Sequence, residues 1–183
     1  ALIAVVLINA FEFTELLWRK DWKRSFKPLP VHANLDEIKR EWPKVSIHVA
    51  CYSEPPELVM NTLDHLAALN YPNFEVLVLD NNTKDPNEWR PLQAYCKKLG
   101  ERVRFFHIEP WGGFKAGALN FGIDQTCPDA KMIAVIDADY VVEDNWLASL
   151  IPYFDNPKVG FVQAPQDHRD WEGDTVKTMI NWE

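Results

Sequence analysis

The sequence predicts an α/β fold, with a mainly parallel sheet flanked by helices. Short runs rich in β-branched and aromatic residues alternate with segments whose apolar residues recur at helical spacing. Such alternation is typical of consecutive βαβ units, in which the strands are parallel. With 183 residues, the chain has the length of one domain, or of one domain with a short appendage.

The expected elements follow from these runs and from the turn residues that bound them. Strands are expected at Val45–Cys51, Phe74–Asp80, Arg102–Ile108, Met132–Asp137 and Val159–Gln163, and helices at Glu57–Leu69, Pro86–Leu99, Phe114–Gln125 and Asn145–Phe154. Residues 28–44 form a polar connector with a short helical stretch over Asn34–Glu41, in which Asn34 is the expected N-cap. Ligands of parallel sheets bind at the carboxyl ends of the strands, so the residues after each strand are the first candidates for function.

Composition excludes several classes of protein. Asp and Glu total 27 and Lys and Arg total 19, a net charge of −8, which disfavours nucleic acid as a partner. The apolar fraction of 47% and the charged fraction of 25% are typical of a globular domain. Three widely spaced cysteines without a CxxC motif predict neither a disulfide framework nor a zinc site, and they favour a reducing compartment.

The first 27 residues have the character of a membrane edge. Residues 1–17 are apolar except at Asn9, Glu12, Thr14 and Glu15, and an aromatic and basic cluster follows over residues 18–27. Because spanning a bilayer takes about 20 apolar residues, the run is too short to span alone. The charge order predicts the end of a transmembrane helix that leaves the inner membrane on its cytoplasmic side, with membrane lipid as a partner. The alternatives are an amphipathic helix packed on the domain and a signal peptide, whose positive charges normally come first.

The loops after the first two strands carry polar side chains and no glycine. Tyr52-Ser53-Glu54-Pro55 stands where a dinucleotide-binding protein has GxGxxG, which disfavours a nicotinamide or flavin enzyme. Tyr52 is suited to stacking on a base and Glu54 to a hydrogen bond with it; alternatively, Glu54 only favours the dipole of the next helix. Asp80 either accepts hydrogen bonds from a ribose or base, or caps the turn into the next helix.

The loops after the third and fourth strands point to an anion and a metal. The glycines of Trp111-Gly112-Gly113 permit a tight turn before a helix with Lys115 near its start, which favours a diphosphate over a merely solvated lysine. Asp137-Ala138-Asp139 ends an apolar strand, and residues two apart on a strand point the same way. Two such carboxylates repel unless a cation lies between them. Mg²⁺ is commonly held by one or two carboxylates plus substrate phosphates.

Together these segments resemble glycosyltransferase family 2, which has the GT-A fold, and within it the processive, cellulose-synthase-like branch of β-glycan synthases. The matching segments are Tyr52-Ser53-Glu54-Pro55, Asp80, Lys115-Ala116-Gly117-Ala118-Leu119-Asn120, Asp137-Ala138-Asp139 and Phe161-Val162-Gln163-Ala164-Pro165-Gln166. They appear in the family's order between residues 45 and 166. The resemblance implies that residues 45–183 are the N-terminal, nucleotide-sugar-binding part of the catalytic domain.

The resemblance also implies an activity: metal-dependent, inverting transfer of a sugar, by analogy glucose, from a UDP-sugar to a growing β-glycan acceptor. The implied site residues are Tyr52, Glu54 and Asp80 around the uridine, Lys115 on the nucleotide side, Asp137 at the nucleotide sugar, Asp139 with Asp137 at Mg²⁺ or Mn²⁺, and Gln163 and Gln166 near the transferred sugar. The family's catalytic base and its Gln-x-x-Arg-Trp motif are expected after Glu183, so neither role is assigned here. Asn81 departs from the family, whose members often carry a second Asp at this position.

Two other readings compete with the synthase. Asp137-Ala138-Asp139-Tyr140-Val141 is similar to the nucleophile motif of haloacid-dehalogenase-like phosphatases, although that motif normally ends the first strand of its domain and here at least three strands precede it. The other reading is a non-catalytic nucleotide-binding module attached to a membrane. The five histidines are scattered without metal-ligand spacing, so a structural or solvated role is expected for each.

Overall fold

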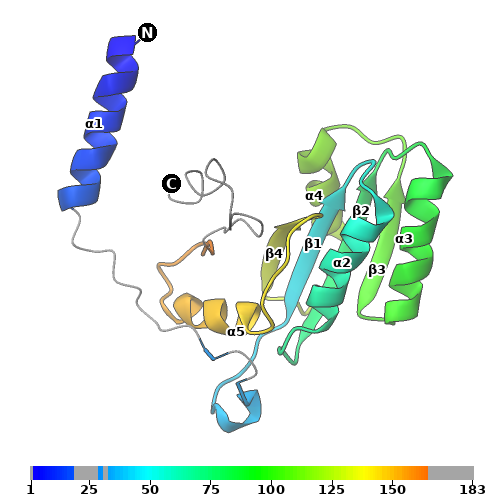
Figure 1. The fold of residues 1–183 in the computed structure, drawn as a ribbon. Helices are drawn as coiled ribbons and strands as arrows, with labels where there is room; N and C mark the ends of the chain where they lie inside the picture. The colour runs from blue at the N-terminus through cyan, green and yellow to red at the C-terminus, as the bar shows by residue number, and fades with distance from the viewer. Residues whose placement is uncertain (1, 19–28, 31–32, 165–183) are drawn as a thin grey trace, which may run out of the picture.

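The computed structural model describes residues 2–18, 29–30 and 33–164, and its centre is a four-stranded sheet (Figure 1). The strands are β1 (Val45–Cys51), β2 (Phe74–Asn81), β3 (Val103–Ile108) and β4 (Met132–Asp137). Their order is β3-β2-β1-β4, and every neighbouring pair is parallel. The predicted parallel α/β architecture is confirmed.

The register of the sheet brings the carboxyl ends of the strands to one edge. At this edge Cys51 of β1 lies opposite Asp80 of β2, and Ala50 lies opposite Asp137 of β4. On the other side of β2, Asp80 lies opposite His107 of β3. Residues from four separate parts of the sequence therefore meet at this edge.

Helices cover both faces of the sheet (Figure 1). Helices α2 (Pro56–Ala67), α3 (Pro86–Leu99) and α5 (Trp146–Leu150) contribute to one apolar core, whereas α4 (Phe114–Gln125) packs on β1 and β2 from the other face. Alternate residues of β2 divide between the two sides, with Val76 and Val78 in the first core and Leu77 and Leu79 against α4. Both faces of β2 are covered, so all eight of its residues are buried.

Local signals fix the helix boundaries. Helix α3 begins at Pro86, preceded by Asp85, whose carboxylate accepts a hydrogen bond from the Asn87 backbone N–H at 2.8 Å. Helix α4 begins after Gly113, whose φ of 86° is readily adopted by glycine. Asn34 caps as predicted, but it caps a single 3₁₀ turn, η1 (Leu35–Glu37), and not a helix that extends to Glu41.

Two expectations near the end of the described chain are wrong. The helix expected over 145–154 is α5 followed by the 3₁₀ helix η2 (Ile151–Asp155), because Pro152 has no N–H to continue the α-helical bonding. The strand expected over 159–163 does not form. The Val159 N–H closes a turn onto the Asn156 carbonyl at 2.9 Å, and within residues 33–164 no segment pairs with the outer edge of β4.

Residues 2–18 form helix α1 (Leu2–Trp18). Several of its apolar side chains are more than half exposed, namely Val5, Val6, Leu7, Ile8, Phe11 and Phe13. Within the described residues, no helix combines the length and the apolar character needed to cross a membrane. The basic and aromatic cluster predicted to follow it lies, apart from Trp18, outside the described residues.

Candidate functional site

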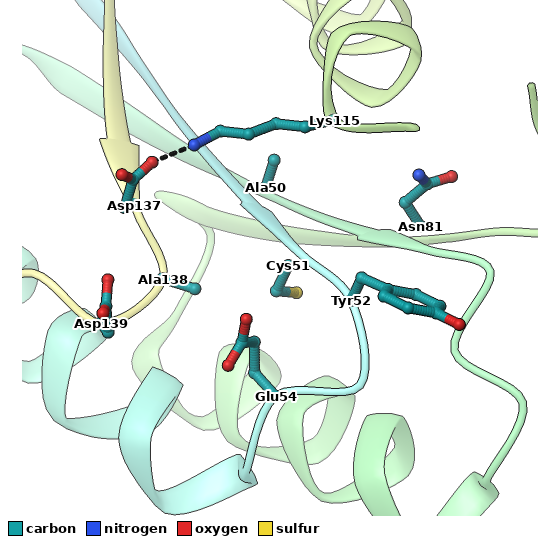
Figure 2. A pocket seen from close by; sticks show the side chains of 9 residues that line it. All are labelled: Ala50, Cys51, Tyr52, Glu54, Asn81, Lys115, Asp137, Ala138 and Asp139. Carbon is teal, nitrogen blue, oxygen red and sulfur yellow. Dashed lines mark hydrogen bonds and ion pairs between the residues drawn. The ribbon is translucent and has the colours of Figure 1, made fainter. Parts of the chain in front are cut away.

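A pocket of about 280 Å³ opens at the carboxyl edge of the sheet. The lining residues come from the ends of β1, β2 and β4 and from the start of α4: Ala50, Cys51, Tyr52, Glu54, Asn81, Lys115, Asp137, Ala138 and Asp139 (Figure 2). Three carboxylates and one ammonium group thus face a space of the size of a small ligand. Five of the predicted site residues meet here, namely Tyr52, Glu54, Lys115, Asp137 and Asp139.

A turn brings the two aspartates of the β4 end into this pocket. Strand β4 stops at Asp137, and the Tyr140 N–H donates to the Asp137 carbonyl at 3.1 Å, so Asp139 already belongs to the turn. Asp139 is not a strand residue, so strand alternation does not align its carboxylate with that of Asp137. This part of the prediction is wrong. The buried Thr62 hydroxyl of α2 donates to the Ala138 carbonyl at 2.8 Å and fixes the turn against that helix.

Lys115 crosses the pocket from α4 to pair with the Asp137 carboxylate (Figure 2). The side chain of Lys115 is 53% exposed and that of Asp137 is 39% exposed. Ion pairs as exposed as this one contribute little stability, at most about 1 kcal/mol. Little free energy is therefore lost when a phosphate binds Lys115, or a cation binds Asp137, in place of this ion pair.

The loop that carries Lys115 has a backbone shape that its glycines permit. A Cβ atom on Gly117 would lie only 1.9 Å from the carbonyl oxygen of Gly112, so the first turn of α4 can approach the loop only with glycine there. The indole N–H of Trp111 closes the same contact by donating to the Gly117 carbonyl at 2.9 Å. Phe114, which is 87% exposed, has a positive φ of 51°. Such strain is typical of backbone that surrounding contacts hold in place.

Asp80 does not line the pocket, contrary to the prediction that it would border the uridine. It is 1% exposed, and its carboxylate is hydrogen-bonded to His107 Nδ1 and to the Thr83 hydroxyl, each at 2.5 Å. The Trp89 ring stacks on His107 with centroids 4.3 Å apart. The next residue, Asn81, takes the position in the pocket wall.

The two glutamines expected near the transferred sugar are not part of the observed site. Gln163 is exposed and does not line the pocket, and Gln166 lies outside the described residues. In turn, no role was predicted for Asn81, Asn82 or Thr62. The Asn81-Asn82 pair after a strand is typical of a turn, and Asn82 does adopt a left-handed φ of 63°, but this signal does not reveal which atoms the amides contact.

The two aspartates fit a metal that completes its coordination with ligand oxygens. Within the described part of the chain, no cluster of three or more His, Cys, Asp or Glu side chains is arranged to hold an ion. Mg²⁺ and related cations commonly take one or two protein carboxylates and fill the other positions with phosphate and water. Asp137 and Asp139 supply such a partial set, and Mg²⁺ or Mn²⁺ suits oxygen donors of this kind.

The thiol of Cys51 in the pocket wall is not a nucleophile. Cys51 is 5% exposed, and burial, reinforced by the nearby Asp80 carboxylate, raises the pKa of its thiol far above the ordinary range. Because only the thiolate attacks, a thiol that stays protonated is inert. Burial and the raised pKa therefore argue against covalent catalysis through Cys51.

The sequence matches the model of the family described as "Glycosyl transferase family 2" over residues 46–183. The chain belongs to glycosyl transferase family 2. It is 33% identical over 135 residues to glucomannan 4-beta-mannosyltransferase 1 of Cyamopsis tetragonoloba, a match that covers 70% of this chain and 25% of the relative. It is 36% identical over 132 residues to beta-monoglucosyldiacylglycerol synthase of Nostoc sp., covering 70% of this chain and 27% of that enzyme. The chain thus spans about a quarter of the length of these relatives.

Solved structures show the same fold. The mannosyltransferase PcManGT from Pyrobaculum calidifontis, in complex with GDP-Man and Mn²⁺, matches with a TM-score of 0.65 at 23% identity, over 92% of this chain and 48% of that chain. S. aureus TarS in complex with UDP-GlcNAc matches with a TM-score of 0.51 at 21% identity, over 68% of this chain and 37% of that chain. The predicted family and its β-glycan synthase branch are confirmed, and the GT-A-like parallel fold with them. The phosphatase reading finds no support.

Proposed function

We propose that this chain forms the donor site of a hexosyltransferase that uses a nucleoside-diphosphate sugar and a divalent cation. One observation carries the proposal: the pocket at the carboxyl edge of the sheet is lined by the carboxylates of Asp137 and Asp139, the ammonium group of Lys115 and the exposed Tyr52. Relatives that transfer mannose or glucose, and structural neighbours solved with GDP-Man or UDP-GlcNAc, support the same donor class.

The two ends of the pocket suit the two ends of such a donor. Lys115, Asp137 and Asp139 gather at one end, where a cation and a lysine suit a diphosphate (Figure 2). Tyr52, which is 61% exposed, and Asn81 lie at the other end, where they suit a nucleobase. The sugar would then extend from the diphosphate toward the open side of the pocket.

The chemistry that fits this site is displacement at the anomeric carbon of the sugar. An acceptor hydroxyl forms the new glycosidic bond, the bond to the diphosphate oxygen breaks, and the nucleoside diphosphate leaves with the bonding electrons. Mg²⁺ or Mn²⁺, when bound by Asp137 and Asp139, supplies Lewis-acid stabilisation of the leaving diphosphate. Lys115 adds a positive charge on the same group, and a carboxylate base receives the acceptor proton.

The finer assignments follow from the family branch. UDP-glucose is the proposed donor, supported by the relative named as a beta-monoglucosyldiacylglycerol synthase. A growing β-glycan is the proposed acceptor, supported by the β-glycan synthases among the relatives. Glu54, which also lines the pocket, is the proposed partner for the ribose or base.

Calorimetric titration of UDP in the presence of Mg²⁺ or Mn²⁺ tests the proposal. We expect the wild type to bind UDP only with the cation, and Asp139→Ala to weaken this binding by about tenfold or more, because one of two protein ligands is lost. Asp124→Ala is the matched control, since it removes an equal charge from an exposed position on α4 that does not line the pocket. Equal affinity in the wild type and Asp139→Ala would contradict the proposal.

We also propose that residues 1–27 attach the chain to the cytoplasmic face of the inner membrane. The exposed apolar side chains of α1 and the basic residues that follow it in the sequence support this assignment. In a flotation assay, the chain should rise with vesicles that contain anionic lipid, whereas a chain shortened to residues 28–183 should stay below. Equal flotation of both chains would count against attachment through this segment.

A further inference from the structure

The turn that carries Asp139 is attached to helix α2 by a side chain that does not line the pocket. Thr62 is 1% exposed, and its hydroxyl donates to the Ala138 carbonyl at 2.8 Å. The Leu58 carbonyl, one turn earlier in α2, is a more distant acceptor at 3.4 Å. Because Thr62 has a single hydroxyl proton, the shorter bond is the one that forms. The hydroxyl therefore connects α2 to the residue between the two pocket aspartates.

The Ala138 carbonyl belongs to the central peptide of a β-turn. The turn runs from Asp137 to Tyr140, and the Tyr140 N–H donates to the Asp137 carbonyl at 3.1 Å. Rotation of the central peptide by about half a turn converts a type I turn into a type II turn, whose third residue needs a positive φ. The third residue here is Asp139, which does not have a positive φ. The turn is therefore not of type II, and its central peptide points the carbonyl at Thr62.

The orientation of this peptide sets the direction of the Asp139 side chain. A flip would change the sign of φ at Asp139 and turn its Cα–Cβ bond away from the present direction. In Figure 2 the Asp139 carboxylate points from the turn toward Asp137. Aspartate is one of the residues that tolerate a positive φ, so its own backbone preference does not forbid the flip. A flip would, however, carry the Ala138 carbonyl away from the Thr62 hydroxyl.

We propose that Thr62 is a positioning residue for the cation site, because its hydroxyl keeps the turn in the orientation that directs the Asp139 carboxylate toward Asp137. This inference rests on the proposed function, in which the two carboxylates share a divalent cation. Without the hydroxyl, flipped and unflipped turns coexist, and only the unflipped turn presents both carboxylates together. The apparent affinity for the cation then falls in proportion to the fraction of chains with the unflipped turn.

Calorimetric titration of UDP at graded Mn²⁺ concentrations separates the cation requirement from the nucleotide contacts. Thr62→Val keeps the shape of the side chain without its hydroxyl, and it should raise the Mn²⁺ concentration for half-maximal enhancement of UDP binding by about tenfold. Saturating Mn²⁺ selects the unflipped turn, so the affinity for UDP should then return to within about twofold of the wild-type value. Thr62→Ser keeps the hydroxyl and should resemble the wild type throughout.

The same substitution at Thr126 is the matched control. The Thr126 hydroxyl also donates to a backbone carbonyl, that of Gly122 at 2.9 Å, but Thr126 does not line the pocket. Thr126→Val should therefore leave the Mn²⁺ requirement unchanged. Urea unfolding establishes that each variant is folded under the conditions of the titration. If Thr62→Val is not folded, Thr62→Ala lacks the same hydroxyl in a smaller side chain and has the same expected result.

A double substitution tests whether Thr62 acts through Asp139. In an Asp139→Ala chain the direction of this side chain no longer matters for the cation. Adding Thr62→Val to Asp139→Ala should therefore change the Mn²⁺ requirement by less than about twofold. Full additivity of the two substitutions would overturn the action through Asp139.

The remaining outcomes separate this inference from the proposed function. An unchanged Mn²⁺ requirement in Thr62→Val, or an equal increase in Thr62→Ser or Thr126→Val, overturns the positioning by the Thr62 hydroxyl and leaves the metal-dependent nucleotide site intact. An affinity of Thr62→Val for UDP that stays low at saturating Mn²⁺ overturns it as well, because the loss then lies outside the cation site. A wild type that does not bind UDP with the cation overturns the proposed function and this inference with it.

Discussion

The carboxyl ends of β2 and β4 lie on either side of β1, and each carries an aspartate with a different environment. Asp80 of β2 is 1% exposed, and its carboxylate is held by His107 and Thr83. The side chain of Asp137 of β4 is 39% exposed and pairs with Lys115 across the pocket. The same residue type at the same place in a parallel sheet thus belongs to the buried structure in one strand and to the candidate site in the other.

The strand order explains this difference. Strand β2 lies inside the sheet, so β3 beyond it supplies His107 directly opposite Asp80. Strand β4 lies at the edge of the described sheet, and Asp137 meets only the start of α4 across open space. An acidic residue after a strand is therefore a ligand candidate where its outer neighbour is missing, and a structural acceptor where that neighbour provides a donor.

The same substitution at both aspartates gives the largest expected effect. Asp80→Ala should lower the free energy of unfolding by about 3 kcal/mol, because it leaves His107 and Thr83 without their buried charged acceptor. Asp137→Ala should change it by less than about 0.5 kcal/mol, because an exposed ion pair adds little, yet it should weaken binding of UDP with Mg²⁺. Urea unfolding gives the stabilities and calorimetry the affinities.

Asp80→Asn narrows the interpretation of this pair. An asparagine has the size of the aspartate but only one acceptor atom, so it should fall between the wild type and Asp80→Ala. If Asp80→Ala and Asp137→Ala have equal stabilities, burial does not separate the two strand ends and the comparison fails.

Much of the fold was predictable because it depends on local sequence. The periodicity of apolar residues and the flanking turn residues predict four strands to within one residue of each observed boundary, and they predict α3 and α4 with the observed bounds. The expected strand over 159–163 shows the limit of such signals. Its β-branched and aromatic composition suits a strand, but a strand also needs a partner edge, and the turn at Asn156 directs this segment elsewhere.

The candidate site was predictable in its chemistry but not in its contacts. Residues after the strands were expected to converge, and five of them do. The burial of Asp80 was not predictable, since it requires knowing that β3 lies beside β2 and that His107 lies opposite Asp80. The Asn82 amide makes two hydrogen bonds to the backbone of Trp111, which is 29 positions away in the sequence. No local sequence pattern reveals a pairing over that distance.

His48 extends the comparison to a polar side chain buried in the middle of β1, between β2 and β4. It lies on β1 between Leu77 of β2 and Val135 of β4, and it is 1% exposed. Its Nε2 is shared with the hydroxyls of Ser46 and Thr126, at 3.1 and 3.0 Å. Its Nδ1 is buried and, within the described chain, has no hydrogen-bond partner.

The smallest expected effect is a pH dependence from His48. Burial lowers its pKa below the ordinary value of 6.5, although the Glu75 carboxylate acts in the opposite direction. Protonation would also place an N–H on Nδ1 without an acceptor, so the folded chain keeps the ring neutral where the unfolded chain takes up a proton. The unfolded state then binds more protons below pH 6.5, and acid favours unfolding.

The free energy of unfolding should therefore fall on acidification, and the His48 contribution to that fall is at most about 0.8 kcal/mol at pH 6. His48→Gln retains a polar atom for the two hydroxyls but does not titrate, so its free energy of unfolding should decline less between pH 7.5 and pH 6. Urea unfolding at both pH values measures the difference. Equal declines in the wild type and in His48→Gln would mean that burial of His48 does not oppose its protonation. The contrast is with Asp80 at the end of β2, which is buried but accepts hydrogen bonds from two side chains.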